Sequence, residues 1–226
     1  MKNYIILSEK SWNKNLASEI SSTFGGNWKL IDSRKDFNIE TITSYDPQYI
    51  FIPHWSHYIS REIYKNFNCV VFHITDLPYG RGGSPLQNLI IRGHEETNIT
   101  AIKVVEEIDA GSVYLKKSMS LLGTAHEIYL RANDIIKKMI IEILENSPIL
   151  CEQSGEVTHF SRRTPKDGNL ESANTLKQVY DMIRMLDAED YPLAFFKTDR
   201  FTIKFSRASF RGDSILADVL IEANNE

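Results

Sequence analysis

The sequence predicts an α/β fold with a mostly parallel β-sheet, and two observations carry this prediction. Short apolar runs recur through the first half of the chain, and segments with helical periodicity separate them. The runs are apolar throughout rather than alternating, which is typical of parallel strands covered by helices on both faces. The chain has 226 residues, of which 42% are hydrophobic and 25% charged, as in a globular protein with a sizeable core.

The first four strands are expected at residues 3–8, 28–32, 49–53 and 69–74. Between them, a helix at 11–24 is ended by Gly25 and Gly26, and a helix at 60–67 has Ser60 as its candidate N-cap. This order is that of a Rossmann-like half, in which ligands bind outside the carboxyl ends of the strands.

The middle of the chain continues with a helix, a hairpin and a second helix. Ser84 is the candidate N-cap of the first helix, Pro85 takes its first position, and Gly93 ends it. The hairpin has arms at 99–105 and 112–117, and the long helix at 123–144 carries a wide apolar stripe.

The amino-acid composition changes near residue 150, where the chain becomes polar and rich in turn residues. A helix is expected at 175–186, a half-buried antiparallel strand at 200–210 and a further strand at 215–221. We therefore predict a Rossmann-like catalytic domain at 1–150 and a small extension at 151–226 that contains a helix and a β-hairpin.

Charge and cysteine content exclude several classes of protein. The formal net charge is −4, which disfavours nucleic-acid binding through the whole surface because phosphate contacts need clustered Lys and Arg. Two cysteines make neither a disulfide framework nor a zinc site. The first apolar run is too short for a signal peptide, and no run is long enough to span a bilayer. We expect a cytoplasmic protein without a membrane partner.

Two titratable residues are candidates for chemistry. His73 ends the fourth apolar run, directly before a loop rich in glycine, and Asp109 lies in the turn of the hairpin. A His and an Asp that meet in the crevice could share a proton, hold an attacking amine and stabilise charge on a carbonyl oxygen. The alternatives are a structural His at a strand end and an Asp that only forms a turn.

The two segments "FHITDLPYGRGGSP" and "TAIKVVEEIDAGSV" resemble the core of the folate-dependent formyltransferases. That family includes methionyl-tRNA formyltransferase, glycinamide ribonucleotide formyltransferase and the sugar N-formyltransferases. The resemblance covers roughly residues 1–145. The positions that match in order and spacing are His73, the loop from Thr75 to Pro78, Gly82, Pro85, Thr100, Asp109 and Gly111.

The resemblance implies that 10-formyltetrahydrofolate donates a formyl group to a primary amine without a metal. His73 would hydrogen-bond the formyl oxygen, and Asp109 would receive the proton of the amine. The folate would contact the loop and the hairpin through Asp76, Leu77, Pro78, Val105, Glu106 and Ile108. The acceptor would contact Tyr79, Arg81, Gly82, Gly83, Arg162 and Arg163.

One position departs from the family. The catalytic asparagine of the family lies two residues before the histidine, where this chain has Val71. Loss of one oxyanion donor typically costs about 10²–10³ in rate. Candidate replacements are the side chains of Thr75, Gln87 and Asn88, or a backbone N–H of the glycine loop.

The segment "RRTPKDG" and the later "DYPLAFF" are similar to sugar N-formyltransferases, although the family glycine of the second segment is missing. The acceptor would then be a nucleotide-linked 4-amino sugar, at best a UDP-linked 4-amino-4,6-dideoxy hexosamine of a surface-glycan pathway, and not a nucleic acid. A methionyl-tRNA formyltransferase would need a larger C-terminal barrel, some eighty residues more. A homodimer is compatible with this interpretation.

Three alternatives stay open. The first is a formyltransferase that acts on glycinamide ribonucleotide or on an aminoacyl group, and the second is a folate- or nucleotide-sugar-binding protein without catalysis, which Val71 favours. A nicotinamide-dependent enzyme has little support, since no G-x-G-x-x-G follows the first strand. His54 and His57 lack a third ligand at a useful spacing, so no metal site is expected.

Overall fold

The computed structural model of the chain describes residues 1–224, which form two compact units. The first unit comprises Met1–Gly82, Thr97–Met119 and Leu130–His159, and the second comprises Gly83–Glu96, Ser120–Tyr129 and the chain from Phe160 onward. The domain boundary expected at residue 150 stays a prediction.

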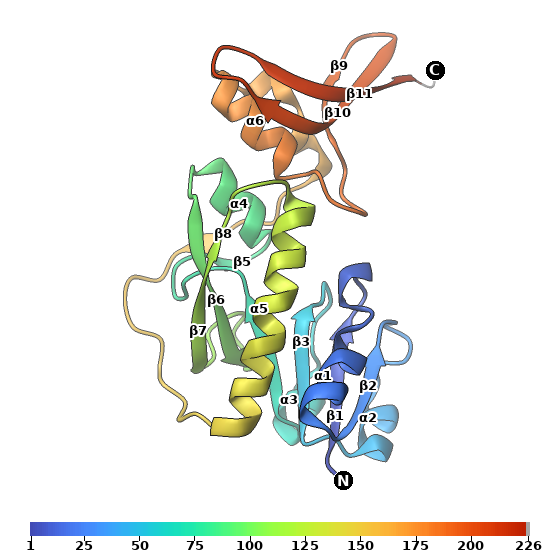
Figure 1. Cartoon of the computed structure of the whole chain (residues 1–226), viewed down its shortest axis with the longest axis vertical. Coiled ribbons are helices and arrows are strands. Elements are labelled where there is room, and N and C mark those ends of the chain that lie inside the picture. The colour runs from blue at the N-terminus through green and yellow to red at the C-terminus, as the bar shows by residue number, and fades with distance from the viewer. Residues whose placement is uncertain (225–226) are drawn as a thin grey trace. The chain divides into compact units, whose positions relative to one another are not determined.

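The first unit is built on a six-stranded sheet with the strand order β2-β1-β3-β4-β6-β7 (Figure 1). Its strands are β1 (Asn3–Ser8), β2 (Asn27–Ile31), β3 (Tyr49–His54), β4 (Cys69–His73), β6 (Glu96–Lys103) and β7 (Val113–Ser120). Strands β2, β1, β3 and β4 pair in parallel, and β6 pairs antiparallel to β4. The predicted α/β fold with a mostly parallel sheet is confirmed.

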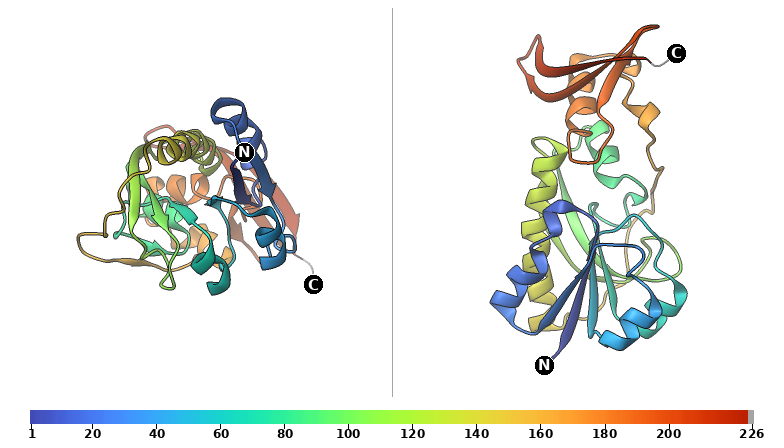
Figure 2. Two further views of the ribbon diagram at one scale, coloured as in Figure 1. Left: turned by 90° about the horizontal axis from the view of Figure 1, so that it is seen from below. Right: turned by 90° about the vertical axis from the view of Figure 1, so that its right-hand side faces the viewer.

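Helices cover both faces of this sheet. They are η1 (Ser11–Asn13), α1 (Leu16–Phe24), α2 (Ile39–Tyr45), α3 (Arg61–Asn66) and α5 (Ala125–Asn146). Within the first unit, α1 and α5 lie on one face and are joined by an ion pair between Glu19 and Lys137, while α2 and α3 lie on the other face (Figure 2). Ile42 of α2 and Ile63 of α3 pack with Ile5 and Ile50 in one apolar cluster. The burial of strand residues on both faces explains their continuously apolar sequences.

The second unit contains α4 (Pro85–Ile91), η2 (Pro165–Gly168), η3 (Leu170–Ser172), α6 (Leu176–Arg184) and a three-stranded sheet of order β11-β10-β9. These strands are β9 (Ala194–Lys197), β10 (Phe201–Phe210) and β11 (Ile215–Ala223), and β10 is antiparallel to both neighbours. The expected hairpin therefore has a third strand. Two short strands, β5 (Arg81–Gly82) and β8 (His159–Phe160), complete the fold.

One predicted helix differs in detail, one helix was missed, and the predicted N-cap Ser84 has its expected position but makes no capping bond. The first helix is regular only from Leu16, because a short 3-10 turn occupies Ser11–Asn13. Helix α2 was not predicted, since "IETITSY" has too few apolar residues for a clear period. Ser84 precedes Pro85 in a left-handed conformation with φ of 50° and makes no capping bond. Its hydroxyl accepts instead from the backbone N–H of Arg163.

Candidate active site

His73 ends β4 and is almost fully buried, with 6% of its surface exposed. Its Nε2 atom lies 2.8 Å from the carbonyl oxygen of Gly80. A carbonyl oxygen only accepts, so Nε2 carries a hydrogen in this contact. On the other side of the ring, Nδ1 lies 3.5 Å from Oδ2 of Asp109. The imidazole is therefore fixed by an N–H donor on the side of the glycine loop, and its Nδ1 atom faces the Asp109 carboxylate.

Asp109 lies in the turn between β6 and β7 with a φ of 54°. This left-handed conformation costs a residue with a side chain roughly 1–2 kcal/mol, so the surroundings must hold it. Its Oδ2 atom accepts a hydrogen bond of 2.9 Å from the backbone N–H of Gly82. The structure thus brings together three predicted site residues, His73, Gly82 and Asp109, from separate segments of the first unit.

The loop after His73 is fixed through Thr100, which lies opposite His73 in the pairing of β4 with β6. The Thr100 hydroxyl donates to the carbonyl of Thr75 over 2.7 Å and accepts from the N–H of Leu77 over 3.4 Å. Lys116 binds the carboxylate of Asp76 over 2.6 Å. Partial burial by itself raises the pKa of Asp76, but hydrogen bonds from Lys116 and Asn98, together with the charge of Lys116, lower it overall. Leu77 and Pro78 are buried.

Thr75 differs from its neighbours in one respect. Its side chain is fully buried, and its Oγ1 atom has no hydrogen-bond partner in the structure. A buried hydroxyl without a partner costs about 1–3 kcal/mol. Such a group lies two residues from His73, and its hydrogen is still available to a ligand oxygen.

The backbone N–H groups of the glycine loop are committed within the protein. Those of Gly80 and Arg81 donate to the hydroxyl and the carbonyl of Thr158, and that of Gly82 donates to Asp109. The N–H of Gly83 donates to the carbonyl of Phe160 in the second unit. None of these four groups is therefore free to replace the missing asparagine.

The other expected replacements lie in the second unit and are also engaged. Gln87 donates to the hydroxyl of Tyr129 and to the carbonyl of Met185. The amide of Asn88 donates to carbonyls of Gly83, Ser84 and Ser161. Val71 itself pairs with Ile52 and Ile102 and offers only methyl groups. Among the candidates weighed from sequence, Thr75 alone keeps an uncommitted donor.

Arg81 is buried and has protein partners for its guanidinium. It donates to Glu107 over 2.8 Å and to Oε1 of Gln153 over 3.1 and 2.9 Å. The expected role of Arg81 as an anion ligand stays a prediction, and these bonds would have to break for it. Tyr79 is half-buried in the same loop.

Gly83, Arg162 and Arg163 belong to the second unit. A Cβ atom at Gly83 would lie 2.6 Å from Cβ of Arg162, so glycine is required for this close approach. Arg163 is half-buried, and its Nε atom has no hydrogen-bond partner. Their contact with an acceptor stays a prediction.

The hairpin turn that carries Asp109 also presents apolar side chains. Val105 is 37% exposed and Ile108 is 56% exposed, while Glu106 accepts from the Tyr58 hydroxyl through its carbonyl over 3.4 Å. Exposed apolar side chains in this turn, and a buried hydroxyl without a partner at Thr75, are features that fit the flat, polar-edged heterocycle of a folate. The residues present therefore suit the implied co-substrate.

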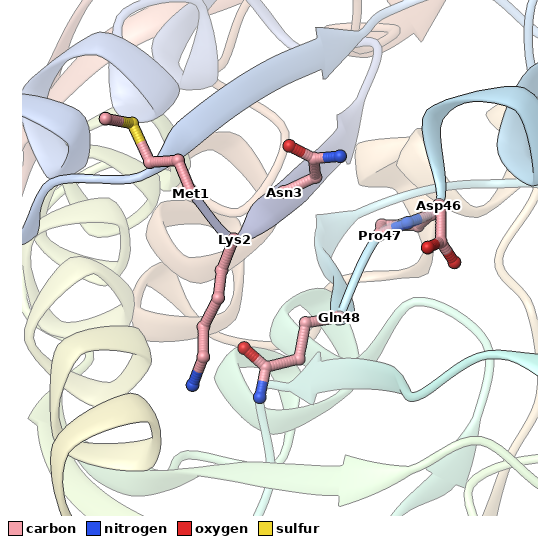
Figure 3. A pocket seen from close by; sticks show the side chains of 6 residues that line it. All are labelled: Met1, Lys2, Asn3, Asp46, Pro47 and Gln48. Atoms are coloured by element: carbon pink, nitrogen blue, oxygen red, sulfur yellow. The ribbon is translucent and has the colours of Figure 1, made fainter.

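Other parts of the described chain are weaker candidates for functional sites, beginning with His54. Burial lowers the pKa of His54 to about 4, with a further contribution from Lys10, so this ring is neutral at physiological pH. Within residues 1–224, no three His, Cys, Asp or Glu side chains gather as metal ligands. A hollow of about 300 Å³ is lined by Met1, Lys2, Asn3, Asp46, Pro47 and Gln48 (Figure 3). These residues precede or begin β1 and β3, whereas His73 ends β4, which runs parallel to β3. No described helix is both long and apolar enough to cross a bilayer.

Sequence reasoning missed two polar residues of the site, Thr158 and Gln153. Both lie in the polar stretch after α5 and reach the loop and the hairpin turn from there. Isolated polar residues in a turn-rich stretch give no periodic signal, so only the three-dimensional contacts reveal them.

Two family models match this chain. The family described as "Formyl transferase" matches residues 10–144, and "Methionyl-tRNA formyltransferase, C-terminal domain" matches residues 165–222. The second match includes most of the "RRTPKDG" segment that was expected to indicate a sugar-acting enzyme. The finer assignment to the sugar subgroup is therefore not supported.

Solved structures point the same way. A "Methionyl-tRNA formyltransferase from Clostridium thermocellum" is 45% identical, with a TM-score of 0.96, and the match covers 99% of this chain and 100% of that one. That chain has no larger barrel, so the expectation of some eighty extra residues does not hold for it. A 4-N formyltransferase from Francisella tularensis shares the fold at a TM-score of 0.66 and 15% identity, over 100% of this chain and 99% of that one.

Curated relatives are longer. The methionyl-tRNA formyltransferase of Thermosipho melanesiensis is 35% identical over 118 residues, which are 51% of this chain and 39% of that protein. That of Thermodesulfovibrio yellowstonii is 23% identical over 204 residues, 86% of this chain and 66% of that protein. The chain thus spans less than two thirds of the length of these relatives.

Proposed function

Because this chain belongs to the formyl transferase family, we propose that it transfers the formyl group of 10-formyltetrahydrofolate to the α-amino group of an aminoacyl acceptor of the methionyl-tRNA type. The observation that supports the chemistry is the contact of His73 with Asp109 at the carboxyl end of β4. The full-length similarity to a protein of that name supports the acceptor over an amino sugar.

The folate would supply an activated formyl group, and the protein would supply a donor and a proton acceptor. The N–H at Nε2 of His73 is the donor for the formyl oxygen, on which negative charge develops as the amine attacks. In the structure that hydrogen is directed to the carbonyl of Gly80, which the substrate oxygen replaces or shares.

Asp109 takes the second role. An amine must lose a proton as it becomes an amide, and a carboxylate within reach of the imidazole can receive it, either directly or through water. As the bond between the formyl carbon and N10 of the folate breaks, this proton would pass to N10, so that tetrahydrofolate leaves with an N–H at that position. The carboxylate also orients the imidazole from its Nδ1 side over 3.5 Å, a distance that can tighten when substrate binds. The hydrogen bond from Gly82 fixes the carboxylate itself.

The formal net charge of −4 bears on an acceptor that carries nucleic acid. Net charge opposes binding along the whole surface, but recognition of an acceptor terminus involves few phosphates. The proposal therefore concerns the aminoacyl end of the acceptor, and a broad positively charged surface is not part of it.

The acceptor is tested by a panel of amines supplied with 10-formyltetrahydrofolate. Methionyl-tRNA, glycinamide ribonucleotide, and UDP- and dTDP-linked 4-amino sugars are each incubated with the protein and with His73→Ala, and the products are weighed by mass spectrometry. We expect the mass of one formyl group on the methionyl ester only, and none with the variant. Formylation of a sugar nucleotide alone would overturn the acceptor and keep the chemistry.

Thr75→Val tests whether the hydroxyl without a partner replaces the family asparagine. Valine has nearly the same shape and removes the unsatisfied hydroxyl, so the free energy of unfolding should stay equal or rise. If Thr75 donates to the formyl oxygen, kcat should nevertheless fall about 10²-fold. Urea unfolding and initial rates are measured on the same preparation, and an unchanged kcat would remove Thr75 from the mechanism.

The predicted homodimer stays a prediction, and the second unit has a surface that suits it. Strand β11 lies at the edge of the three-stranded sheet, and Leu216, Val219, Leu220 and Ile221 are each more than half exposed. Sedimentation velocity of the wild type beside Ile221→Glu decides whether a second copy covers this edge.

A further inference from the structure

Gln153 connects three parts of the catalytic site through one side chain. Its Nε2 atom donates to the carbonyl of Asp109 over 2.8 Å and to that of Gly111 over 2.9 Å. Its Oε1 atom accepts from Nε and from one terminal nitrogen of Arg81 over 3.1 and 2.9 Å. A glutamine side chain has two N–H donors and two acceptor positions, so all of them are used.

These bonds bear directly on the conformation of Asp109. Its left-handed φ of 54° needs support, and Gln153 holds the carbonyl of this residue and that of the second residue after it. With the backbone fixed on both sides, the carboxylate reaches the N–H of Gly82 and the imidazole of His73.

Arg81 completes the arrangement from the glycine loop. Its guanidinium contacts Gln153 on one edge and Glu107 of the hairpin turn on another, where a bond of 2.8 Å forms. The loop that carries Gly80 and Gly82 is thereby joined to the turn that carries Asp109. A side chain with this many partners within the protein is placed to orient neighbours.

We propose that Gln153 is a positioning residue for formyl transfer, which sets Asp109 against His73, and that Arg81 orients Gln153 instead of binding an anionic group of the substrate. This inference rests on the proposed function. It adds a residue from outside the two sequence segments that carry the resemblance to the family.

Two substitutions separate the parts of this role. Gln153→Leu removes all its hydrogen bonds at similar size, and Gln153→Glu keeps an acceptor for Arg81 but loses the donors to the two carbonyls. The matched control is Glu152→Ala. Glu152 is exposed and bonds the Ser112 hydroxyl over 2.8 Å, so it joins the same two segments without touching Asp109 or Arg81.

We expect both Gln153 variants to lower kcat about 10- to 100-fold, because small displacements of a catalytic group cost rates of this order. The KM for the folate should change less than about threefold, since the folate contacts proposed above remain in place. Glu152→Ala should retain the wild-type kcat. Wild-type kcat in Gln153→Leu, or a loss confined to KM, would overturn the proposal.

Arg81→Lys tests whether Arg81 orients Gln153 or binds an anionic group of the substrate. A positioning role predicts a lower kcat with an unchanged KM for the acceptor, because lysine keeps the charge but cannot form the paired bonds to Gln153. An anion-binding role predicts the reverse, a higher KM at unchanged kcat, and this result would contradict the assignment.

A readout without catalysis keeps the test independent of the proposed function. The ring nitrogen resonances of His73 are recorded by NMR in the wild type, Gln153→Leu and Glu152→Ala. We expect them to move in Gln153→Leu only, since the Asp109 contact changes. Unmoved resonances would overturn the positioning role. An inactive wild type whose resonances move with Gln153→Leu would instead count against the proposed function alone.

Discussion

Asp109→Asn is expected to lower kcat for formyl transfer about 10²–10⁴-fold, the range by which positioned acid–base groups accelerate reactions. Asparagine cannot take the proton of the amine, although it keeps the shape of the side chain. Asparagine also tolerates a left-handed backbone, so the turn at residue 109, where φ is 54°, should persist. Steady-state rates at saturating folate, with the thermal midpoint measured alongside, give the comparison.

The matched control is Asp46→Asn. Asp46 also adopts a left-handed conformation, with φ of 47°. It caps the end of α2 and precedes β3, whereas His73 lies at the end of β4. It is exposed and contacts no site residue. We expect wild-type kcat for this variant. Comparable kcat in both variants would remove Asp109 from proton transfer.

Gly111→Ala is expected to destabilise the first unit strongly. A Cβ atom at this position would lie 1.7 Å from the carbonyl oxygen of Lys103, far inside any allowed contact. The carbonyl oxygen of Lys103 belongs to the backbone, and the backbone at position 111 fixes where the Cβ atom lies, so no rotamer change relieves the overlap. The N–H of Lys103 is also bonded to the carbonyl of Ser112 across the hairpin. We expect a loss of several kcal/mol, in the range reserved for severe core or backbone conflicts, measured by urea unfolding.

Gly93→Ala provides the comparison for a glycine with space around it. Nothing lies within 4 Å of its hypothetical Cβ atom, and only its positive φ of 82° opposes a side chain. The expected cost is about 1 kcal/mol. An unfolding midpoint of Gly111→Ala equal to that of Gly93→Ala would show that the ends of β6 and β7 yield easily, and would weaken the account of the turn.

Much of the first unit could be predicted because its strands are buried on both faces. Continuous apolar sequence is the direct result of that burial, as at Ile5 and Ile50, which are fully covered. His73 stood out because it ends such a run directly before a glycine-rich loop, although a structural His at a strand end was the alternative. Asp109 could be paired with it only through the resemblance to a family.

Other features of the structure depend on contacts between distant segments, which the sequence alone does not predict. The left-handed Ser84 gave no capping bond, because the chain from the second half of the protein supplies Arg163 as its partner. From the sequence, Arg81 could be a surface cation. In the structure it is buried and bonded to Gln153 and Glu107. The sugar acceptor was expected from a short polar segment, and the comparisons favour the aminoacyl alternative instead.

Our main claim is that His73 and Asp109 together carry out formyl transfer. The most direct measurement is a single-turnover reaction of the wild type with 10-formyltetrahydrofolate and methionyl-tRNA, beside His73→Ala at matched folate occupancy. We predict one formyl group on the methionyl amine with the wild type, and a rate at least about 10²-fold lower with the variant. Transfer at the wild-type rate by His73→Ala would contradict the claim, as would folate binding by the wild type without transfer to any amine of the panel.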